Sequence, residues 1–464
     1  MKHLYHTTPE EVQPTPGAIG RWFASLKQLH QRLRSHFARP EPYQHALLYL
    51  QAVLSEIPRK NGWQIAEHAR LPHPYGIQRL LARATWDQDS VRDELRSFVC
   101  QSLTSPSPSS GGSDPSTPFP VGVVDESGFP KRGHHSAGVG PQYCGRTGQI
   151  ENCQMGVFLS YVPENGHALI DRELYLPEDW CSDLPRRQAA HIPDTIRFQT
   201  NLELAKLMIQ RTQSAHVPIR WIVADTVYGH SSDLRQWLQE QGYAYALAVP
   251  STEVIYAQTP TGTLLSDVGR LAHQVRRRDW QRLSQSLGTK GERLFDWAIL
   301  PWMQAGCVDQ RHFLVIRCCL DDPSTLAFFL VFAPLDTSLA TIVQAIGARW
   351  RIEEDLEASK DLGLDQYEVR SFPGWYRHLT LVLLAYAFLV GLTVQQRLGD
   401  SPQDSPAACS PMIPLTPSEI RHLLARLLFF APASAPLVYH WSHFRRTHQY
   451  WAGYYHRRRR EKAD

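Results

Sequence analysis

Two short apolar runs that each lead into an aspartate constrain the fold of this chain more than any other feature. Val121–Val124 leads into Asp125, and Ile219–Ala224 leads into Asp225. Runs of this length, rich in β-branched residues and bounded by turn-forming residues, are typical of buried strands. Amphipathic helical patterns lie between and after them. The alternation predicts an α/β protein with a mixed sheet, in which both aspartates stand at the ends of strands.

The remaining apolar runs extend this pattern along the 464 residues. Further strands are expected at Gln154–Val162, Ala168–Leu176, Tyr243–Val249, Leu294–Leu300, His312–Cys319 and Leu326–Phe332. Two stretches rich in Ser, Pro and Gly are expected to be linkers. The predicted parts are a helical N-terminal region (1–103), a linker (104–120), a body (121–398) with a β-rich insertion at about 250–332, a second linker (399–417) and a helical, basic C-terminal region (418–464).

Composition excludes several classes of protein. The chain is 43% hydrophobic and 20% charged, as in soluble globular proteins. Its eight cysteines include no C-x-x-C pair, so neither a disulfide framework nor a zinc site is expected. The apolar run Leu379–Val394 is short for a membrane span and predicts a buried helix. The segment Met1–Glu10 lacks an apolar signal core. We therefore expect a cytoplasmic protein without a membrane partner.

A third acid lies in the segment R-W-R-I-E-E-D-L-E-A-S-K, from Arg349 to Lys360. If this segment is a helix, Arg349, Glu353 and Lys360 fall within about 40° of one another on one face. A carboxylate between two cations suits a metal ligand with phosphate-binding neighbours. Glu354 is turned about 100° away and is expected to face solvent or form an ion pair.

The three acids Asp125, Asp225 and Glu353 together suggest a catalytic metal site. Carboxylate oxygens suit Mg²⁺ or Mn²⁺. Two such ions about 4 Å apart can activate an attacking hydroxyl and stabilise the leaving oxygen during phosphodiester cleavage. Taken singly, a strand-end aspartate is more often a turn former or a helix cap than a metal ligand; the combination with Glu353 favours the ligand. Glu126 follows Asp125 and is expected to point to the opposite face of the strand.

Basic residues near these acids are expected to hold a nucleic-acid strand. The candidates for contacts with phosphates are Lys131, Arg132, Arg349 and Lys360. Further cations cluster at Arg276, Arg277 and Arg278, and the segment from Trp441 to Asp464 holds seven Arg or Lys against two acids. Such clusters on a chain of net charge +3 favour contacts with a polyanion, although solvated surfaces are the alternative.

The N-terminal region contains a segment that resembles a helix-turn-helix. A helix is expected at Trp63–Arg70, a turn at Leu71–Pro74 and a second helix at Tyr75–Ala84. Three polar residues would face outward from the second helix, where they could contact DNA: Gln78, Arg79 and Arg83. A plain helical hairpin fits the same pattern, so both interpretations stay open.

These motifs together resemble the DDE transposases of bacterial insertion sequences, in the subgroup whose glutamate lies in an R-W-x-I-E helix. The matching segments are D-E-S-G-F-P-K-R-G, Q-Y-C-G-R-T-G-Q-I-E-N-C-Q, V-A-D-T-V-Y-G, R-W-R-I-E-E-D-L-E-A-S-K and G-L-D-Q-Y-E-V-R-S-F-P-G-W-Y-R-H. The resemblance covers about 121–395 and also 63–96. It implies an RNase H-like core with a metal-binding triad of Asp125, Asp225 and Glu353. Relatives usually have a tyrosine three residues before Arg349, where this chain has Ile346.

The resemblance implies a transposase that uses two Mg²⁺ or Mn²⁺ ions to cleave double-stranded DNA at terminal inverted repeats and join it to target DNA. It also implies a homodimer or higher oligomer on DNA, in the bacterial cytosol with the nucleoid. Two alternatives remain: a catalytically silent, transposase-derived DNA-binding protein, and an RNase H-like nuclease without strand transfer. The presence of all three acids argues against the first. The sequence leaves open the inverted repeat, the target site and the route of second-strand cleavage.

Overall fold

The computed structural model describes residues 16–104, 118–145, 147–259, 262–288, 291–303, 311–366, 368–399, 414–429 and 432–460. Most of both expected linkers, 104–120 and 399–417, therefore lies outside the described residues.

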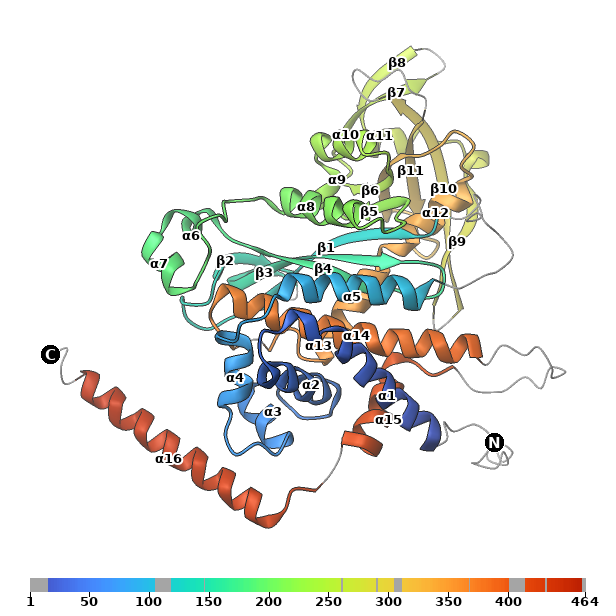
Figure 1. Cartoon of the computed structure of the whole chain (residues 1–464). Helices are drawn as coiled ribbons and strands as arrows, with labels where there is room; N and C mark the ends of the chain where they lie inside the picture. The colour runs from blue at the N-terminus through green and yellow to red at the C-terminus, as the bar shows by residue number, and fades with distance from the viewer. Residues whose placement is uncertain are drawn as a thin grey trace. The chain divides into compact units, whose positions relative to one another are not determined.

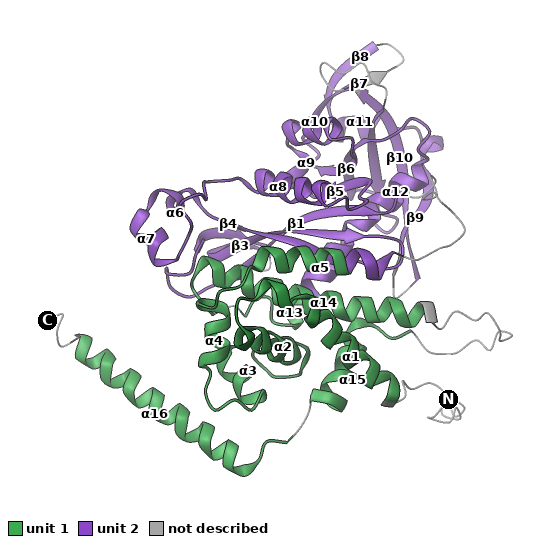
Figure 2. Ribbon diagram, viewed as in Figure 1, with its two compact units in different colours: residues 1–98, 358–464 green, residues 99–357 purple. Residues whose placement is uncertain are grey.

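The chain divides into two compact units, shown in Figure 2. Unit 1 combines residues 1–98 with 358–464, and unit 2 comprises residues 99–357. The sequence predicted a body that continues to residue 398. The contacts instead group 358–398 with the two terminal segments, because the apolar helix in this stretch packs on the N-terminal helices.

Unit 2 is built on a mixed sheet. Its described residues form twelve strands in the order β2-β3-β1-β5-β6-β12-β11-β10-β7-β8, with β4 paired to β3 and β9 to β10 (Figure 1). The strands are β1 (Val121–Pro130), β2 (Gly140–Cys144), β3 (Gln149–Val162), β4 (Ala168–Tyr175), β5 (Trp221–Ala224), β6 (Ala244–Val249), β7 (Val254–Thr259), β8 (Gly262–Asp267), β9 (Gln281–Gly288), β10 (Gly291–Met303), β11 (His312–Cys318) and β12 (Leu326–Phe332).

Helices alternate with the strands of unit 2, so the predicted α/β class is confirmed. They are α6 (Glu178–Ser182), α7 (Leu184–Ala189), α8 (Asn201–Ser214), α9 (Thr226–Gly229), α10 (Ser232–Glu240), α11 (Val268–Ala272), α12 (Leu339–Ala348) and α13 (Trp350–Asp361), the last of which runs into unit 1. A capping box starts α8: the Thr200 hydroxyl accepts from the Glu203 N–H, and the Glu203 carboxylate accepts from the Thr200 N–H.

Strand β1 is longer than the sequence predicted. It pairs in parallel with β5 only from Val121 to Val124, but its antiparallel pairing with β3 continues to Pro130. Asp125 therefore lies within a strand, at the point where the neighbour on one side ends. Gly128 does not turn the chain. It allows a close approach of β2 instead, since a Cβ there would lie 2.7 Å from the Cys144 sulfur.

The β-rich insertion extends the main sheet. Strand β12 pairs antiparallel with β6, and β11 and β10 continue outward from it. Its apolar side chains share one core cluster with the end of β6, with Val249, Leu330 and Trp302 among its buried members. The three strands predicted in this segment are confirmed. The sequence did not predict β7, β8 and β9. Strand β8 is largely exposed where it is described, whereas Ile255 and Ala257 of β7 are buried in the core cluster of the insertion.

Unit 1 is helical. Its helices are α1 (Pro16–Arg32), α2 (Pro40–Leu54), α3 (Gly62–His68), α4 (Tyr75–Ala82), α5 (Gln88–Leu103, which runs into unit 2), α14 (Phe372–Gly399), α15 (Pro417–Leu424) and α16 (Ala435–Arg460). Helix α14 is the described helix long and apolar enough to cross a membrane, but 89% of its most apolar window is buried inside the protein. The predicted buried helix is therefore confirmed.

Polar side chains fix α14 within unit 1. The His378 ring lies 2.7 Å from the Tyr49 hydroxyl and 2.9 Å from the Gly363 carbonyl oxygen. Arg377 donates to the carbonyl of Leu81 at 3.1 Å. These buried hydrogen bonds join α14 to α2 and to the end of α4, so Arg377 and His378 serve the packing of unit 1.

A close contact between α12 and β9 gives a test of this packing. A Cβ at Gly347 would lie 2.2 Å from the Gln285 carbonyl oxygen. We predict that Gly347→Ala lowers the free energy of unfolding by about 1–3 kcal/mol, because backbone must move. Urea denaturation measures the change.

Gly20→Ala is the matched control, because Gly20 also lies in a helix and a Cβ there meets nothing within 4 Å. This variant should gain up to about 1 kcal/mol from helix propensity. Equal effects of the two substitutions would contradict the proposed close packing at Gly347.

Candidate active site

Parallel pairing of β1 with β5 places Asp125 beside Asp225. Val124 is paired with Ala224, so Asp125 and Asp225 follow at the same level, where β5 ends and β1 continues beside β3. The Asp225 carboxylate accepts a hydrogen bond from the Val227 N–H at 3.0 Å and caps α9. Asp225 is therefore a helix cap, which was the alternative to a metal ligand. The cap uses one carboxylate oxygen and does not exclude a second function for the other.

The two aspartates lie in an unfavourable electrostatic environment. Burial, the neighbouring Asp225 and Glu126 raise the pKa of Asp125 to about 7. Burial also raises the pKa of Asp225. Desolvated carboxylates that repel one another prefer to bind a proton or a cation.

Glu126 joins this acidic group, which the sequence did not predict. Its carboxylate accepts a hydrogen bond from the Tyr228 hydroxyl at 2.9 Å, and burial with the charge of Asp225 raises its pKa to about 7. Strand alternation does separate the Asp125 and Glu126 side chains. The α9 turn, however, brings buried Tyr228 to the Glu126 side, so both faces of β1 carry an acid at this edge.

Arg349 electrostatically links Glu353 to the two aspartates. Its guanidinium forms an ion pair with Glu353 at 2.6 Å, one helical turn apart, and the two side chains are 28% and 34% exposed. The same positive charge opposes the rise in pKa at both Asp125 and Asp225. Arg349 therefore acts as a counterion to the acidic group in this structure.

The donor set fits a hard divalent cation. Asp125, Asp225 and Glu353 offer only carboxylate oxygens, which Mg²⁺ and Mn²⁺ prefer. The pKa of both aspartates is raised although Arg349 lowers it, so nearby positive charge does not fully offset their burial. Among the described residues, no group of three or more His, Cys, Asp or Glu side chains is already arranged to hold a metal ion.

The predicted phosphate-binding residues occupy different environments. Arg132 is exposed after β1, whereas Lys131 is half-buried and its N–H donates to the Asn152 carbonyl at 2.9 Å. Lys360 is half-buried in the last turn of α13. In the basic triplet that begins at Arg276, Arg276 and Arg278 form ion pairs with Asp279, and Arg277 lies in the same 3₁₀ turn.

The predicted helix-turn-helix corresponds to α3 and α4 of unit 1. Arg79 and Arg83 are exposed, as the sequence predicted. Gln78 is half-buried instead, because its side chain packs against Gly62: a Cβ at Gly62 would lie 3.0 Å from the Gln78 Cγ. The close approach of the two helices thus directs Gln78 inward.

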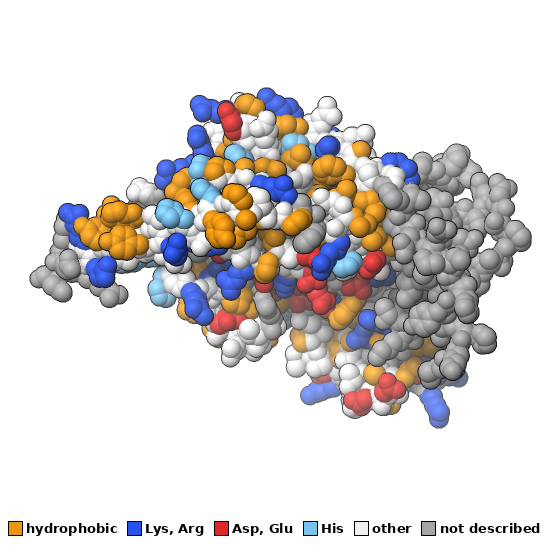
Figure 3. All heavy atoms as spheres, turned by 90° about the horizontal axis from the view of Figure 1, so that it is seen from below, with side chains coloured by type: hydrophobic (Ala, Val, Ile, Leu, Met, Phe, Trp, Pro, Cys, Tyr) orange, Lys and Arg blue, Asp and Glu red, His pale blue; other side chains and the backbone are white. Residues whose placement is uncertain are grey.

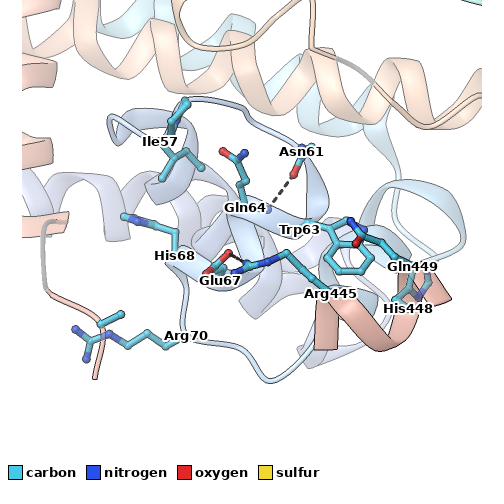
Figure 4. A pocket seen from close by; sticks show the side chains of 12 residues that line it. Ile57, Asn61, Trp63, Gln64, Glu67, His68, Arg70, Arg445, His448 and Gln449 are labelled. Atoms are coloured by element: carbon cyan, nitrogen blue, oxygen red, sulfur yellow. Dashed lines mark hydrogen bonds and ion pairs between the residues drawn. The ribbon is translucent and has the colours of Figure 1, made fainter. Parts of the chain in front are cut away.

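A cavity of about 720 Å³ lies between α3 and α16 within unit 1 (Figure 4). Glu67 and Arg445 form an ion pair at 2.6 Å across it. The Trp63 ring packs against Trp441 and His448 of α16, which fixes this helix beside the helix-turn-helix. The cavity belongs to unit 1, whereas the catalytic candidates belong to unit 2.

Comparisons with known proteins agree with the sequence motifs. The family described as DDE superfamily endonuclease matches residues 32–297, a range that includes Asp125 and Asp225 but ends before Glu353. A curated relative from Microchaete diplosiphon, described as a probable transposase for insertion sequence element IS701, is 25% identical over 249 residues. That match covers 53% of this chain and 57% of the relative, so the chain spans little more than half of the relative's length.

A solved structure described as the piggyBac transposase synaptic complex with hairpin DNA is also similar. It is 11% identical, and the superposition covers 92% of this chain and 83% of that chain with a TM-score of 0.41.

The raised pKa of Asp125 predicts an effect on stability. At pH 8, with a chelator present, Asp125→Asn should increase the free energy of unfolding by about 1–3 kcal/mol, because the variant removes a desolvated, repelled charge. A group with a raised folded-state pKa destabilises the fold most above that pKa, here about 7. The gain should therefore shrink as the pH falls from 7 towards 4. Urea denaturation at several pH values measures it, and a gain that does not change with pH would contradict the assigned cause.

Proposed function

Because this chain belongs to the DDE superfamily endonuclease family, we propose that it is a transposase, one that cleaves DNA at the ends of its element and joins them to target DNA. The observation that carries the proposal is the meeting of Asp125 and Asp225 on adjacent parallel strands, with Arg349, the ion-pair partner of Glu353, acting electrostatically on both. The name of the curated relative supports the same reaction.

The strand order supports an RNase H-like core. Strands β3 and β4 are antiparallel neighbours on one side of β1, and β5 and β6 run parallel on the other. The insertion that contains β7 to β12 then lies between the second aspartate and the helix that carries Glu353. This arrangement matches the plan expected from the sequence motifs.

The metal-binding residues in this proposal are Asp125, Asp225 and Glu353. Bound Mg²⁺ or Mn²⁺, as two ions, would activate the attacking water or 3′-hydroxyl and stabilise the leaving oxygen. Arg349, now paired with Glu353, would be free to contact a phosphate of the cleaved strand once Glu353 has another positive partner. Lys360, Lys131 and Arg132 would hold the same strand.

The proposed partner is double-stranded DNA. Exposed Arg79 on α4 and exposed Arg83 just after its end suit contacts with the terminal inverted repeat. Helix α16 beside it has six arginines and no acid. Its exposed aromatic residues Tyr450, Trp451, Tyr454 and Tyr455 adjoin these cations, and hydrophobic and basic side chains mingle at its C-terminal end, on the left of Figure 3. Basic, aromatic surfaces suit a DNA backbone.

Further contacts and the assembly complete the proposal. Arg276, Arg277 and Arg278 would bind phosphates of end or target DNA. A homodimer or higher oligomer would bring the two ends together, and the protein would act in the bacterial cytosol at the nucleoid.

Neutral isosteric variants test the catalytic triad. We predict that Asp125→Asn, Asp225→Asn or Glu353→Gln each abolishes cleavage of a duplex that carries the element's end, while binding to that duplex survives. Cleavage with Mg²⁺ is followed on denaturing gels, and binding by gel shift. Glu357→Gln is the control, because Glu357 is exposed one turn further along α13.

The outcomes separate the competing functions. Cleavage that persists in a triad variant would refute the assignment of that acid. A wild-type protein that binds ends but never cuts would be a silent DNA-binding protein. Cutting without joining to a target plasmid would identify a nuclease that lacks strand transfer.

Binding measured against salt tests the contribution of α16. Replacing Arg457, Arg458 and Arg459 with Gln should reduce the slope of log K against log salt by up to about 3, since each lost phosphate contact removes about 0.9. The control replaces three arginines held in ion pairs elsewhere: Arg186, Arg270 and Arg282. An α16 variant whose salt slope equals that of the wild type would show that this helix does not contact DNA.

A further inference from the structure

Helix α13 carries a second carboxylate on the side opposite Glu353. Asp355 follows two residues later, about 200° around the helix, so the two side chains point in nearly opposite directions. The Asp355 side chain is completely buried, whereas Glu353 is 34% exposed. A carboxylate buried this deeply needs partners, because an unpaired charge in the interior is strongly destabilising.

Two residues of the β3–β4 hairpin supply those partners. The buried Ser160 of β3 donates its hydroxyl proton to one Asp355 oxygen. The Nδ1 atom of His167, in the loop just before β4, lies 2.6 Å from the other oxygen. Both carboxylate oxygens of Asp355 are thus bound to the sheet on which α13 packs.

His167 also reaches the next residue of the helix. Its Nε2 atom lies 3.2 Å from Glu354, which Arg351 contacts at 2.8 Å. Ionised carboxylates only accept hydrogen bonds, so both ring nitrogens of His167 must donate, and the ring is an imidazolium. Burial works against this charge, but Asp355 and Glu354 outweigh it and raise the pKa of His167 to about 9.

The register of the sheet places this network close to the catalytic candidates. Ser160 is paired with Val123, and Asp125 is paired with Phe158, so Ser160 and Asp125 are diagonal neighbours on one face of the sheet. Diagonal neighbours in a sheet lie about 7–8 Å apart. The helix is therefore fixed to the sheet near one of the two aspartates.

Packing alone would not require this network. Buried ion pairs add little stability compared with apolar residues of similar volume, and their best-attested use is to specify one arrangement. An apolar contact lets a helix slide or rotate, whereas two charge-assisted hydrogen bonds to one carboxylate fix its rotation. The network therefore controls the direction in which Glu353 points.

We propose that Ser160, His167 and Asp355 form an anchor that sets the rotation of α13 and holds Glu353 in position to share a metal ion with Asp125 and Asp225. We assign these three as positioning residues, since they act on Glu353 through the helix that carries it. The inference rests on the proposed function and adds to it the means by which the third acid is oriented.

Metal dependence of the full-length protein tests the anchor. In His167→Ala, the Mn²⁺ concentration for half-maximal cleavage of end DNA should rise about 10- to 100-fold, the usual cost of losing a residue that orients a ligand. The Mn²⁺ concentration that produces half of the metal-induced rise in Tm should increase by the same factor. Binding to end DNA should not change.

Ser160→Ala is the second variant, because it leaves the His167–Asp355 pair intact and removes one hydrogen bond. It should shift both Mn²⁺ midpoints in the same direction by a smaller factor. His273→Ala, at an exposed histidine of the same unit, is the control and should shift neither. If His167→Ala does not fold, Ser160→Ala decides the question.

The results distinguish this inference from the proposed function. Unchanged Mn²⁺ midpoints in folded His167→Ala would overturn the proposed anchor, even if Tm and the cleavage rate both fall. If His167→Ala does not fold, unchanged midpoints in Ser160→Ala would overturn it. A wild-type protein that neither cleaves end DNA nor is stabilised by Mn²⁺ would overturn the proposed function and the anchor with it.

Discussion

The parallel pairing of β1 with β5 is the constraint on which the rest of the site depends. It brings Asp125 and Asp225 side by side, where burial raises the pKa of both and the charge of Asp225 raises that of Asp125 further. No local preference of either segment would place two acids together. The tertiary fold holds the two carboxylates in this unfavourable electrostatic environment. A divalent cation would therefore bind most favourably beside them.

The charges around this pair are divided between two sides of α13. On one side Arg349 neutralises Glu353 and moderates the pKa of the aspartates. On the other side Ser160 and His167 hold Asp355 in the interior. Helix α13 thus carries Glu353, which is partly exposed, and Asp355, which is buried and hydrogen-bonded. Because the two acids are two residues apart, they lie on nearly opposite sides of the helix.

Much of this could be predicted from the sequence, and the failures have local physical reasons. The strands of the core other than β2, the insertion strands β10 to β12, the buried α14 and the exposure of Arg79 and Arg83 follow from apolar runs and periodicity. The continuation of β1 past Asp125 was missed, because Gly128 and Pro130 are turn formers unless a partner strand such as β3 accepts them. Gln78 was placed outward because periodicity cannot reveal that Gly62 opens a space for it.

The sequence by itself determined the α/β class and membership of the family, and it suggested the three acids of the proposed metal site, because these depend on residue types at fixed spacings. Only the tertiary structure decided how the insertion joins the sheet, which side chain faces Glu126, and what holds Asp355. Those features depend on pairs of residues distant in the chain, such as Tyr228 with Glu126 and His167 with Asp355. Their energies come from burial and charge in the folded protein, which no local pattern encodes.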